Sequence, residues 1–147
     1  MRRLALPLWL AGCVAVLAYA IFSDGTEIAA DPVQDTLDCV ALDGDTIRCG
    51  ETRYRLWGVH APERHDPGGP QAQAALAEII APGVSCEPTG ATSWDRIVAR
   101  CYVDGRDVAE MMIEAGVAAD CPAFSGGAYR EFETDAGRAL PLPDYCD

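Results

Sequence analysis

No lysine occurs in the sequence, so its permanent positive charges are all arginines. Two of the 11 arginines are Arg2 and Arg3, and beyond Phe22 the other nine stand against 23 acidic residues, a net charge of −14. A charge of this sign repels polyanions and excludes a protein that covers nucleic acid with a broadly basic surface. Four of the nine arginines fall between positions 48 and 64, however, so a local positive site can exist within an acidic surface. Alternatively, the acidic surface only keeps the domain soluble.

No charged residue interrupts residues 4–22, a run of 19 apolar residues that follows Met1, Arg2 and Arg3. This pattern directs a chain to a membrane or across it. The length can just span a bilayer and favours an uncleaved anchor, whereas residues 18–20 (Ala-Tyr-Ala) fit a cleaved signal peptide, and Cys13 fits a lipoprotein, the third interpretation. We expect an exported bacterial protein, either anchored in the inner membrane and facing the periplasm or periplasmic or secreted after cleavage.

The sequence also lacks any Cys-x-x-Cys pair, the spacing of many structural zinc sites. Cys13 aside, six cysteines remain on separate predicted elements, an even number that indicates disulfides in a small exported domain. Zinc on the cysteines is the competing use. Disulfides between cysteines that face each other across a hairpin are favoured, and a third disulfide would then hold the C-terminal tail. The expected pairs are Cys39 with Cys49, Cys86 with Cys101, and Cys121 with Cys146.

A chain of 147 residues without internal repeats holds one packed domain. We expect an anchor or signal segment at 1–22, a linker at 23–35 and the domain at 36–147. Alternating apolar and polar residues predict strands at 36–42, 46–49 and 52–59, with a turn at Asp43 and Gly44. Further strands are expected at 84–87 and 97–103, separated by a loop of turn-forming residues at 88–95.

Helical periodicity predicts three helices. The first opens at 68–70 and ends at Pro82 and Gly83, with an apolar face between them. The second begins at a capping box of Asp107 and Glu110 and stops at Gly116. A weaker pattern predicts a third helix at 128–138. We therefore expect an α+β, mainly β fold with about three helices, stapled by disulfides, in the order of a five-stranded Greek-key barrel of the OB type.

Three motifs carry a resemblance to a known family. They are residues 43–46 (Asp-Gly-Asp-Thr), residues 55–63 (Arg-Leu-Trp-Gly-Val-His-Ala-Pro-Glu) and residues 95–103 (Asp-Arg-Ile-Val-Ala-Arg-Cys-Tyr-Val). In this order, with a helix between the second and the third, the chain resembles the staphylococcal nuclease-like (thermonuclease) family over about residues 36–138. The resemblance implies a metal-dependent nuclease that cuts DNA and RNA and leaves 3′-phosphate ends, with Ca²⁺ as the usual metal.

Carried over by position, the resemblance implies catalytic and metal-binding roles. Arg55 and Arg96 would hold the phosphate and neutralise its growing charge, and Glu63 would order or deprotonate the attacking water. Asp45 would bind the metal, supported by Asp43, with the carbonyl of Ala61 as a further ligand. Each residue also has an ordinary structural interpretation, such as a turn aspartate or a surface ion pair, and the joint occurrence favours the functional one.

One position departs from the family in a way that changes the chemistry. The family usually has a metal-binding Asp where this chain has His60. An imidazole is a poorer ligand for Ca²⁺ and a better one for Mn²⁺ or another transition metal. His60 thus has three interpretations: a ligand of such a metal, an acid or base, or the mark of a site without turnover.

Two hypotheses of different classes stand beside each other. The first is an exported nuclease for single-stranded or unpaired DNA or RNA. The second is a catalytically weakened or inactive OB-type binding module at the cell envelope. We expect a monomer, associated with the membrane through the N-terminal segment.

Overall fold

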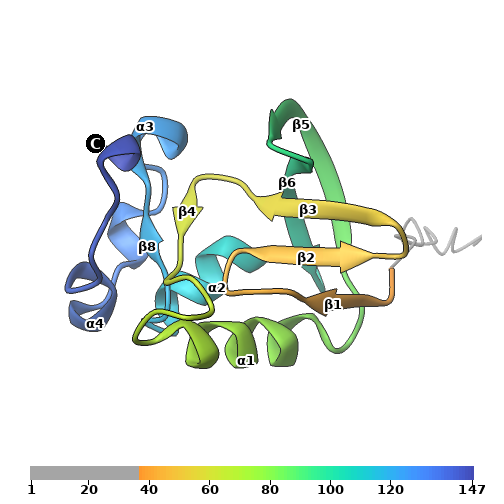
Figure 1. Ribbon diagram of the computed structural model, residues 1–147, viewed down its shortest axis with the longest axis horizontal. Helices are drawn as coiled ribbons and strands as arrows, with labels where there is room; N and C mark the ends of the chain where they lie inside the picture. Colours follow the sequence, from red (N-terminus) through yellow and green to blue (C-terminus); the bar gives the residue numbers. More distant parts are fainter. Residues whose placement is uncertain (1–36) are drawn as a thin grey trace, which may run out of the picture. The chain divides into compact units, whose positions relative to one another are not determined.

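The sheet is built from a three-stranded meander and a two-stranded hairpin, and both carry residues of the candidate site. The computed structural model describes residues 37–147, which lie within one compact unit, Gln34–Asp147. Strands β1 (Cys39–Ala41), β2 (Thr46–Cys49) and β3 (Thr52–Leu56) form an antiparallel meander (Figure 1). The predicted meander is therefore present, although the predicted third strand, 52–59, is broken. Gly58 has a φ of +74° there, and β4 (Val59–His60) pairs with β8 (Ala119–Asp120) in a separate two-stranded sheet.

The second hairpin extends the sheet along β3. Strand β6 (Arg96–Val103) lies parallel to β3 and antiparallel to β5 (Ser85–Ser93), and the short β7 (Arg106–Asp107) pairs with β6. The prediction of a loop at 88–95 was wrong for most of its length. A bulge between Pro88 and Thr92 absorbs the extra residues, and the Thr89 hydroxyl donates to the Val98 carbonyl, which keeps the two strands together.

The five principal strands follow the order β1-β2-β3-β6-β5, so β1 and β5 are the two edges. The segments just before these strands meet at an isolated bridge. The Leu37 amide donates to the Val84 carbonyl at 2.8 Å, and the Val84 amide donates back at 3.3 Å. The chain is thus a mixed α+β fold, mainly sheet, and this bridge joins its edges at one end.

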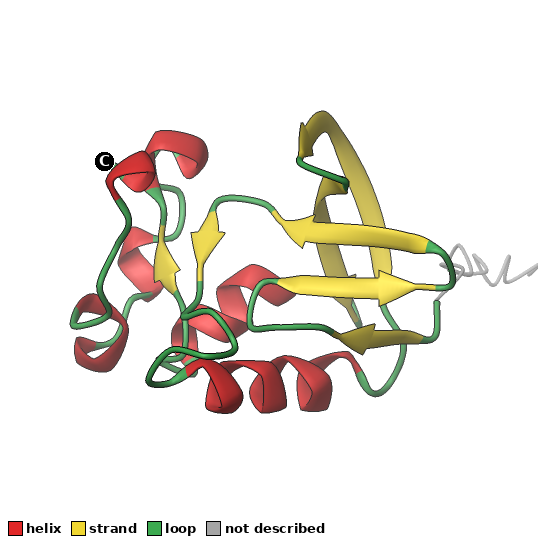
Figure 2. Ribbon diagram, viewed as in Figure 1, coloured by secondary structure: helices red, strands yellow, loops and turns green. Residues whose placement is uncertain are grey.

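Helices cover one side and one end of the sheet. Helix α1 (Gly69–Ile80) packs against β1 and against α2 (Val108–Glu114), whose N-terminus is capped by the Asp107 carboxylate through the Ala109 amide. Figure 2 shows the short C-terminal helices gathered with β4 and β8 at one end of the sheet. The buried core lies between the sheet and the first two helices and includes Ile47, Leu56, Leu76, Val84, Met112 and Ile113.

The C-terminal segment differs from the single helix predicted at 128–138. It forms α3 (Pro122–Ser125), a 3₁₀ turn η1 (Arg130–Phe132), α4 (Asp135–Arg138) and a second 3₁₀ turn η2 (Asp144–Cys146). The Thr134 hydroxyl accepts from the Gly137 amide and starts a new short helix, which divides the expected one. Residues 37–147 therefore form four α-helices where about three were predicted.

Three disulfides join the pairs that were expected: Cys39–Cys49, Cys86–Cys101 and Cys121–Cys146. The first two link facing residues of β1 with β2 and of β5 with β6. The third holds η2 to the end of β8. The predicted anchor and linker lie outside the described residues, and within residues 37–147 no helix is long and apolar enough to cross a bilayer.

Candidate active site

Asp45 lies at the centre of the charged residues that the motifs singled out. It directly precedes β2, and only 3% of its surface is exposed. Its Oδ2 forms an ion pair with Nη1 of Arg55, and its Oδ1 accepts a hydrogen bond from the Thr46 hydroxyl at 3.0 Å. Thr46 faces Arg55 in the register of β2 and β3, so the sheet itself places this arginine beside the carboxylate.

Arg96 approaches the same carboxylate from β6. Its Nη1 donates to the Thr46 hydroxyl at 2.9 Å and lies 4.0 Å from Asp45 Oδ1. Two further bonds, to the Ser93 carbonyl and hydroxyl, hold the guanidinium in place. The side chains of Arg55 and Arg96 keep 13% and 20% of their surface exposed, so both cations are mostly buried yet reachable.

Asp43 is held beside Asp45 by a tight loop. Its Oδ1 accepts from the Asp45 amide at 3.1 Å. Between the two residues, a Cβ on Gly44 would lie 2.6 Å from the Cβ atoms of both Ala61 and Ala72, so only glycine fits here. Burial raises the pKa of Asp43 above its ordinary value, and the negative charge of Asp45 raises it further.

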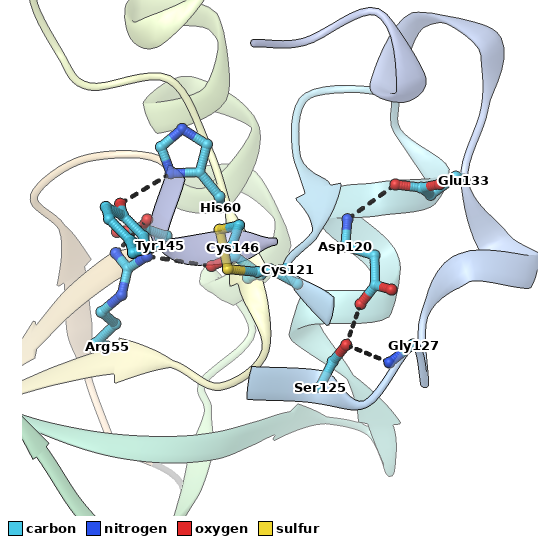
Figure 3. The surroundings of a disulfide bond; sticks show 11 residues. Arg55, His60, Asp120, Cys121, Ser125, Gly127, Glu133, Tyr145 and Cys146 are labelled. Carbon is cyan, nitrogen blue, oxygen red and sulfur yellow. Dashed lines mark hydrogen bonds and ion pairs between the residues drawn. A yellow bond between two sulfur atoms is a disulfide. The ribbon is translucent and has the colours of Figure 1, made fainter. Parts of the chain in front are cut away.

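His60 is buried at the edge of this cluster, with 8% of its surface exposed. Burial lowers the pKa of His60 below its usual value, and the Arg55 charge lowers it further, whereas Asp45 opposes the shift. The ring is therefore neutral at pH 7. Its Nδ1 lies 3.5 Å from the Tyr145 hydroxyl, at the outer limit of a hydrogen bond (Figure 3).

Glu63 stands on the wall of a pocket of about 720 Å³ that Arg55 and Arg96 also line. The side chain is exposed, and among residues 37–147 it forms no ion pair and no side-chain hydrogen bond. The neighbouring Ala61 is buried, with 2% exposure, under the loop of Gly44. The pocket thus has two cations and one unpaired carboxylate on its surface.

The sequence-predicted residues divide into two groups. Asp43, Asp45, Arg55 and Arg96 come together around one carboxylate, and Glu63 shares the pocket with the two arginines. Three contributors were missed. Thr46 is the last residue of the first motif, and Ser93 lies two residues before the third. Tyr145 directly precedes Cys146, whose expected bond to Cys121 was the available signal.

Oxygen donors in this cluster suit a hard divalent cation. Asp45 Oδ2 is buried and has no hydrogen-bond partner besides its ion pair with Arg55, and Asp43 adds a second carboxylate beside it. Within the described residues, no group of three or more His, Cys, Asp or Glu is arranged to hold a metal. The protein donors therefore fit a cation that takes most of its ligands from water and from a bound molecule.

A family model for staphylococcal nuclease homologues matches residues 53–137, more than half of the chain. The chain belongs to this family. The matched segment of the staphylococcal nuclease homologue includes Arg55, Glu63 and Arg96, whereas Asp43 and Asp45 lie just before it. The two aspartates nevertheless lie beside the two arginines in the structure, because the pairing of β2 with β3 brings the two segments together.

One curated relative is similar over most of this chain. It is the "Succinoglycan biosynthesis protein ExoI" of Rhizobium meliloti (strain 1021), 30% identical over 121 residues. The similarity covers 74% of this chain and 62% of the relative. This staphylococcal nuclease homologue thus spans less than two thirds of the length of that relative.

Proposed function

We propose that this protein is an exported nuclease that hydrolyses the phosphodiester bonds of single-stranded or unpaired DNA or RNA and leaves 3′-phosphate ends. The observation that carries the proposal is the convergence of Arg55 and Arg96 on one wall of a pocket that also presents the unpaired carboxylate of Glu63. We also infer that the sheet, joined by the Leu37–Val84 bridge, is a five-stranded barrel of the OB type.

The two arginines would bind the substrate phosphate. Both are oriented by fixed partners, Arg55 by the Val59 carbonyl and Arg96 by Ser93, so little ordering is required when the phosphate arrives. As water attacks phosphorus, negative charge grows on the phosphoryl oxygens, and two preorganised guanidinium groups stabilise that charge more than they stabilise the ground state.

Glu63 would act as the general base. Because no other described side chain forms an ion pair or a hydrogen bond with its carboxylate, Glu63 can accept the proton of a water molecule. The water oxygen forms the new bond to phosphorus as the bond from phosphorus to the 5′ oxygen breaks. Phosphorus with the water oxygen becomes the 3′-phosphate, and the leaving 5′ oxygen takes up a proton and becomes the 5′-hydroxyl. Glu63 must be ionised for this step.

A divalent cation would be held by Asp45 and Asp43, with the Ala61 carbonyl and His60 as further candidate ligands. Such an ion supplies positive charge at the phosphate when bound. By family resemblance the ion is Ca²⁺, and His60 favours Mn²⁺ or another transition metal. Burial and the neighbouring charge of Asp45 raise the pKa of Asp43, and a positive ion bound between the two carboxylates would offset both effects.

The second candidate is a weakened or inactive binding module. It is favoured by His60, which stands where the family usually has a carboxylate, and by the lack of a three-ligand group among residues 37–147. The same arginines would then bind phosphate without cleavage. The name of the curated relative refers to succinoglycan biosynthesis, and it assigns no nuclease role to either protein.

The test is cleavage of an end-labelled single-stranded oligonucleotide by the full, oxidised chain with Ca²⁺, Mn²⁺, Zn²⁺ or EDTA. Glu63→Gln should lower kcat by at least about 100-fold. Asp66→Asn is the matched control, because Asp66 is an exposed carboxylate in the same loop that does not line the pocket. Phosphatase treatment of the products reports whether their 3′ ends carry phosphate. If the folded protein binds the strand but does not cleave it with any of the three metals, the nuclease is ruled out and the binding module takes its place.

A further inference from the structure

Two arginines lie directly opposite each other on the exposed face of the meander. Arg48 of β2 faces Arg53 of β3 in the register of these two strands, which run side by side (Figure 1). Both residues are exposed, and on the other side of β2 the apolar Val40 of β1 faces Arg48. Like charges at facing positions destabilise a sheet. The chain thus concentrates positive charge here at a cost to its own stability, although its net charge is strongly negative.

The carboxylates nearby leave this arginine pair with unmatched positive charge. Nη1 of Arg53 forms an ion pair with Oδ2 of Asp95 at 2.6 Å, and the two side chains remain 49% and 67% exposed. Glu51, in the turn that joins β2 to β3, forms an ion pair with neither arginine, and Arg48 has no ion pair at all among residues 37–147. Exposed ion pairs are weak, so Arg53 can take a second anion at little cost.

The register of β2 and β3 relates the pair to the proposed active site. On β3, Arg55 lies two residues beyond Arg53, and on β2, Thr46 lies two residues before Arg48. Side chains two residues apart on a strand share one face, at a spacing of about 6.7 Å. Successive phosphates of an extended nucleic acid strand are a similar distance apart. A strand whose reacting phosphate lies at Arg55 and Arg96 can therefore bring a neighbouring phosphate to the arginine pair.

A second hollow lies between the larger pocket and the arginine pair. It has a volume of about 240 Å³, and Arg53 and Arg96 both line it, while Arg96 also lines the larger pocket. Asp43 and Asp95 line the hollow too, so the two carboxylates balance the two guanidinium groups inside it. The charge that attracts an anion is thus found beyond the hollow, where Arg48 faces Arg53.

We propose that Arg48 and Arg53 form a second phosphate-binding site, which holds a phosphate next to the one bound by Arg55 and Arg96 on the same strand. The inference rests on the proposed function and extends it beyond the reacting bond. Two guanidinium groups on adjacent strands contact a phosphate from two sides, and the bound anion also removes their mutual repulsion. A dinucleotide has one phosphodiester and leaves this site empty, so the protein should favour substrates with a further phosphate.

The first experiment measures the binding of a labelled thymidine octamer by fluorescence anisotropy in EDTA over a range of salt concentrations. Each phosphate that a protein neutralises on a single strand contributes about 0.7 to the slope of log Kd against log salt concentration. Replacing Arg48 and Arg53 together by Gln should lower the slope of the full, oxidised chain by about 0.7 and weaken binding about tenfold at low salt.

The matched control replaces Arg106 and Arg138 together by Gln. Both are exposed arginines in ion pairs with carboxylates, and neither lines the pocket or the hollow. The control therefore removes the same charge from the protein and should leave the slope unchanged. A purely structural role of Arg53, as the partner of Asp95, would not change the slope either. Circular dichroism and the mass of the unreduced protein report whether each variant keeps its fold and disulfides.

The second experiment needs no variant and changes the substrate. A thymidine dinucleotide is compared with the same dinucleotide carrying a terminal phosphate at its 5′ or its 3′ end, which adds charge without a base. For the unmodified chain, one of the two phosphorylated forms should be cleaved with a kcat/KM about tenfold higher than that of the plain dinucleotide. The double variant at Arg48 and Arg53 should lose this gain, and the control variant should keep it.

Each result supports or overturns the second site. An equal change of slope in the two double variants, or no change in either while the unmodified chain binds and cuts DNA, overturns the site and leaves the nuclease standing. The same holds if neither terminal phosphate raises kcat/KM. An unmodified chain that binds no octamer and cuts nothing overturns the proposed function together with the inference.

Discussion

The two sides of the pocket are held by different means. On the arginine side, which comprises Asp45, Arg55 and Arg96, the placement follows from the register of neighbouring strands. On the aromatic side, which comprises His60, Phe124 and Tyr145, the partners come from a two-stranded sheet, a one-turn helix and a tail that is held by a disulfide. On the arginine side, backbone pairing is repeated at successive residues along the strands. On the aromatic side, the tail is held in place by one covalent link between residues 25 apart.

In the proposed nuclease, this difference divides the residues that would act on the phosphate from Phe124 and Tyr145, which line the rest of the pocket. Geometry that must be accurate at the reacting phosphate is built on the most regular part of the sheet, as precise sites generally are. The aromatic side can vary without displacing the arginines, because no hydrogen bond of Arg55 or Arg96 that the structure describes involves the tail. The two sides can therefore be perturbed one at a time.

The largest effect is expected on the arginine side. Arg55→Lys should lower kcat for single-stranded DNA by at least about 100-fold, because a lysine cannot make the planar two-point contact with a phosphate. Arg106→Lys is the control, since Arg106 forms an exposed ion pair with Glu114 away from the pocket. Steady-state kinetics with circular dichroism measure both. Unchanged turnover in Arg55→Lys would remove this arginine from the mechanism.

Removal of single disulfides should separate the two sides. Replacing both Cys121 and Cys146 by Ala should lower the free energy of unfolding by about 3 kcal/mol and raise KM, because Tyr145, which lines the pocket, is released. Replacing both Cys86 and Cys101 should cost a similar amount of stability and leave KM unchanged. Urea unfolding and steady-state kinetics test the pair. An equal rise of KM in both double variants would show that general loosening, and not the tail, controls binding.

His60 lies where the two sides meet. His60→Asp should add a carboxylate ligand to the proposed metal site on the arginine side. A third carboxylate near Asp45 and Asp43 should raise Ca²⁺-dependent cleavage about tenfold, because ligand charge strengthens a calcium site. His65→Asp is the matched control, since His65 is exposed in the adjoining loop. A calcium titration of the cleavage rate distinguishes them. No gain in His60→Asp would show that calcium binding does not limit the reaction.

The smallest effect is expected beneath the aromatic side, at Tyr129. Its hydroxyl donates to the Asp107 carboxylate at 2.7 Å, and its ring packs edge-on against Trp57. Burial raises the pKa of Tyr129 well above 10, and the Asp107 bond adds to this. A tyrosine of the unfolded chain ionises near pH 10 and the folded one does not, so the free energy of unfolding should fall as the pH rises above 10.

Tyr129→Phe should remove that alkaline decline in stability. At pH 7 it should lower the free energy of unfolding by about 1–2 kcal/mol, because the Asp107 carboxylate loses a partner. Urea unfolding at pH 7 and at pH 10–11 measures both effects. An alkaline slope that persists in Tyr129→Phe would assign it to another group.

The regular elements were predictable from local patterns. The turn at Asp43 and Gly44, the alternation in β2 and the proline and glycine that end α1 are short-range signals, and the structure follows them. The extension of β5 was missed because Pro88, Thr89 and Gly90 are turn formers by composition. Their strand pairing depends on a bond from the Thr89 hydroxyl to β6 that no local pattern shows.

The candidate site was predictable only where motifs contain its residues. Arg55 and Arg96 are distant in sequence, yet family resemblance placed them together, and the structure brings both to Asp45. Tyr145 and Phe124 belong to no motif. Their position requires the fold of the tail, which is set by a long-range disulfide and by the bond of Ser125 to Asp120.

The convergence of two arginines on Asp45 also bears on how substrate reaches the protein. At long range, the net charge of −14 beyond Phe22 would repel the nucleic acid strand of the proposed function, whereas Arg55 and Arg96 would attract its phosphate at close range. Added salt weakens the distant repulsion first, because mobile ions screen charges that are farther apart than about 8–10 Å. If nucleic acid is the substrate, the encounter rate should thus rise with modest ionic strength, the reverse of the behaviour of a nuclease with a basic surface.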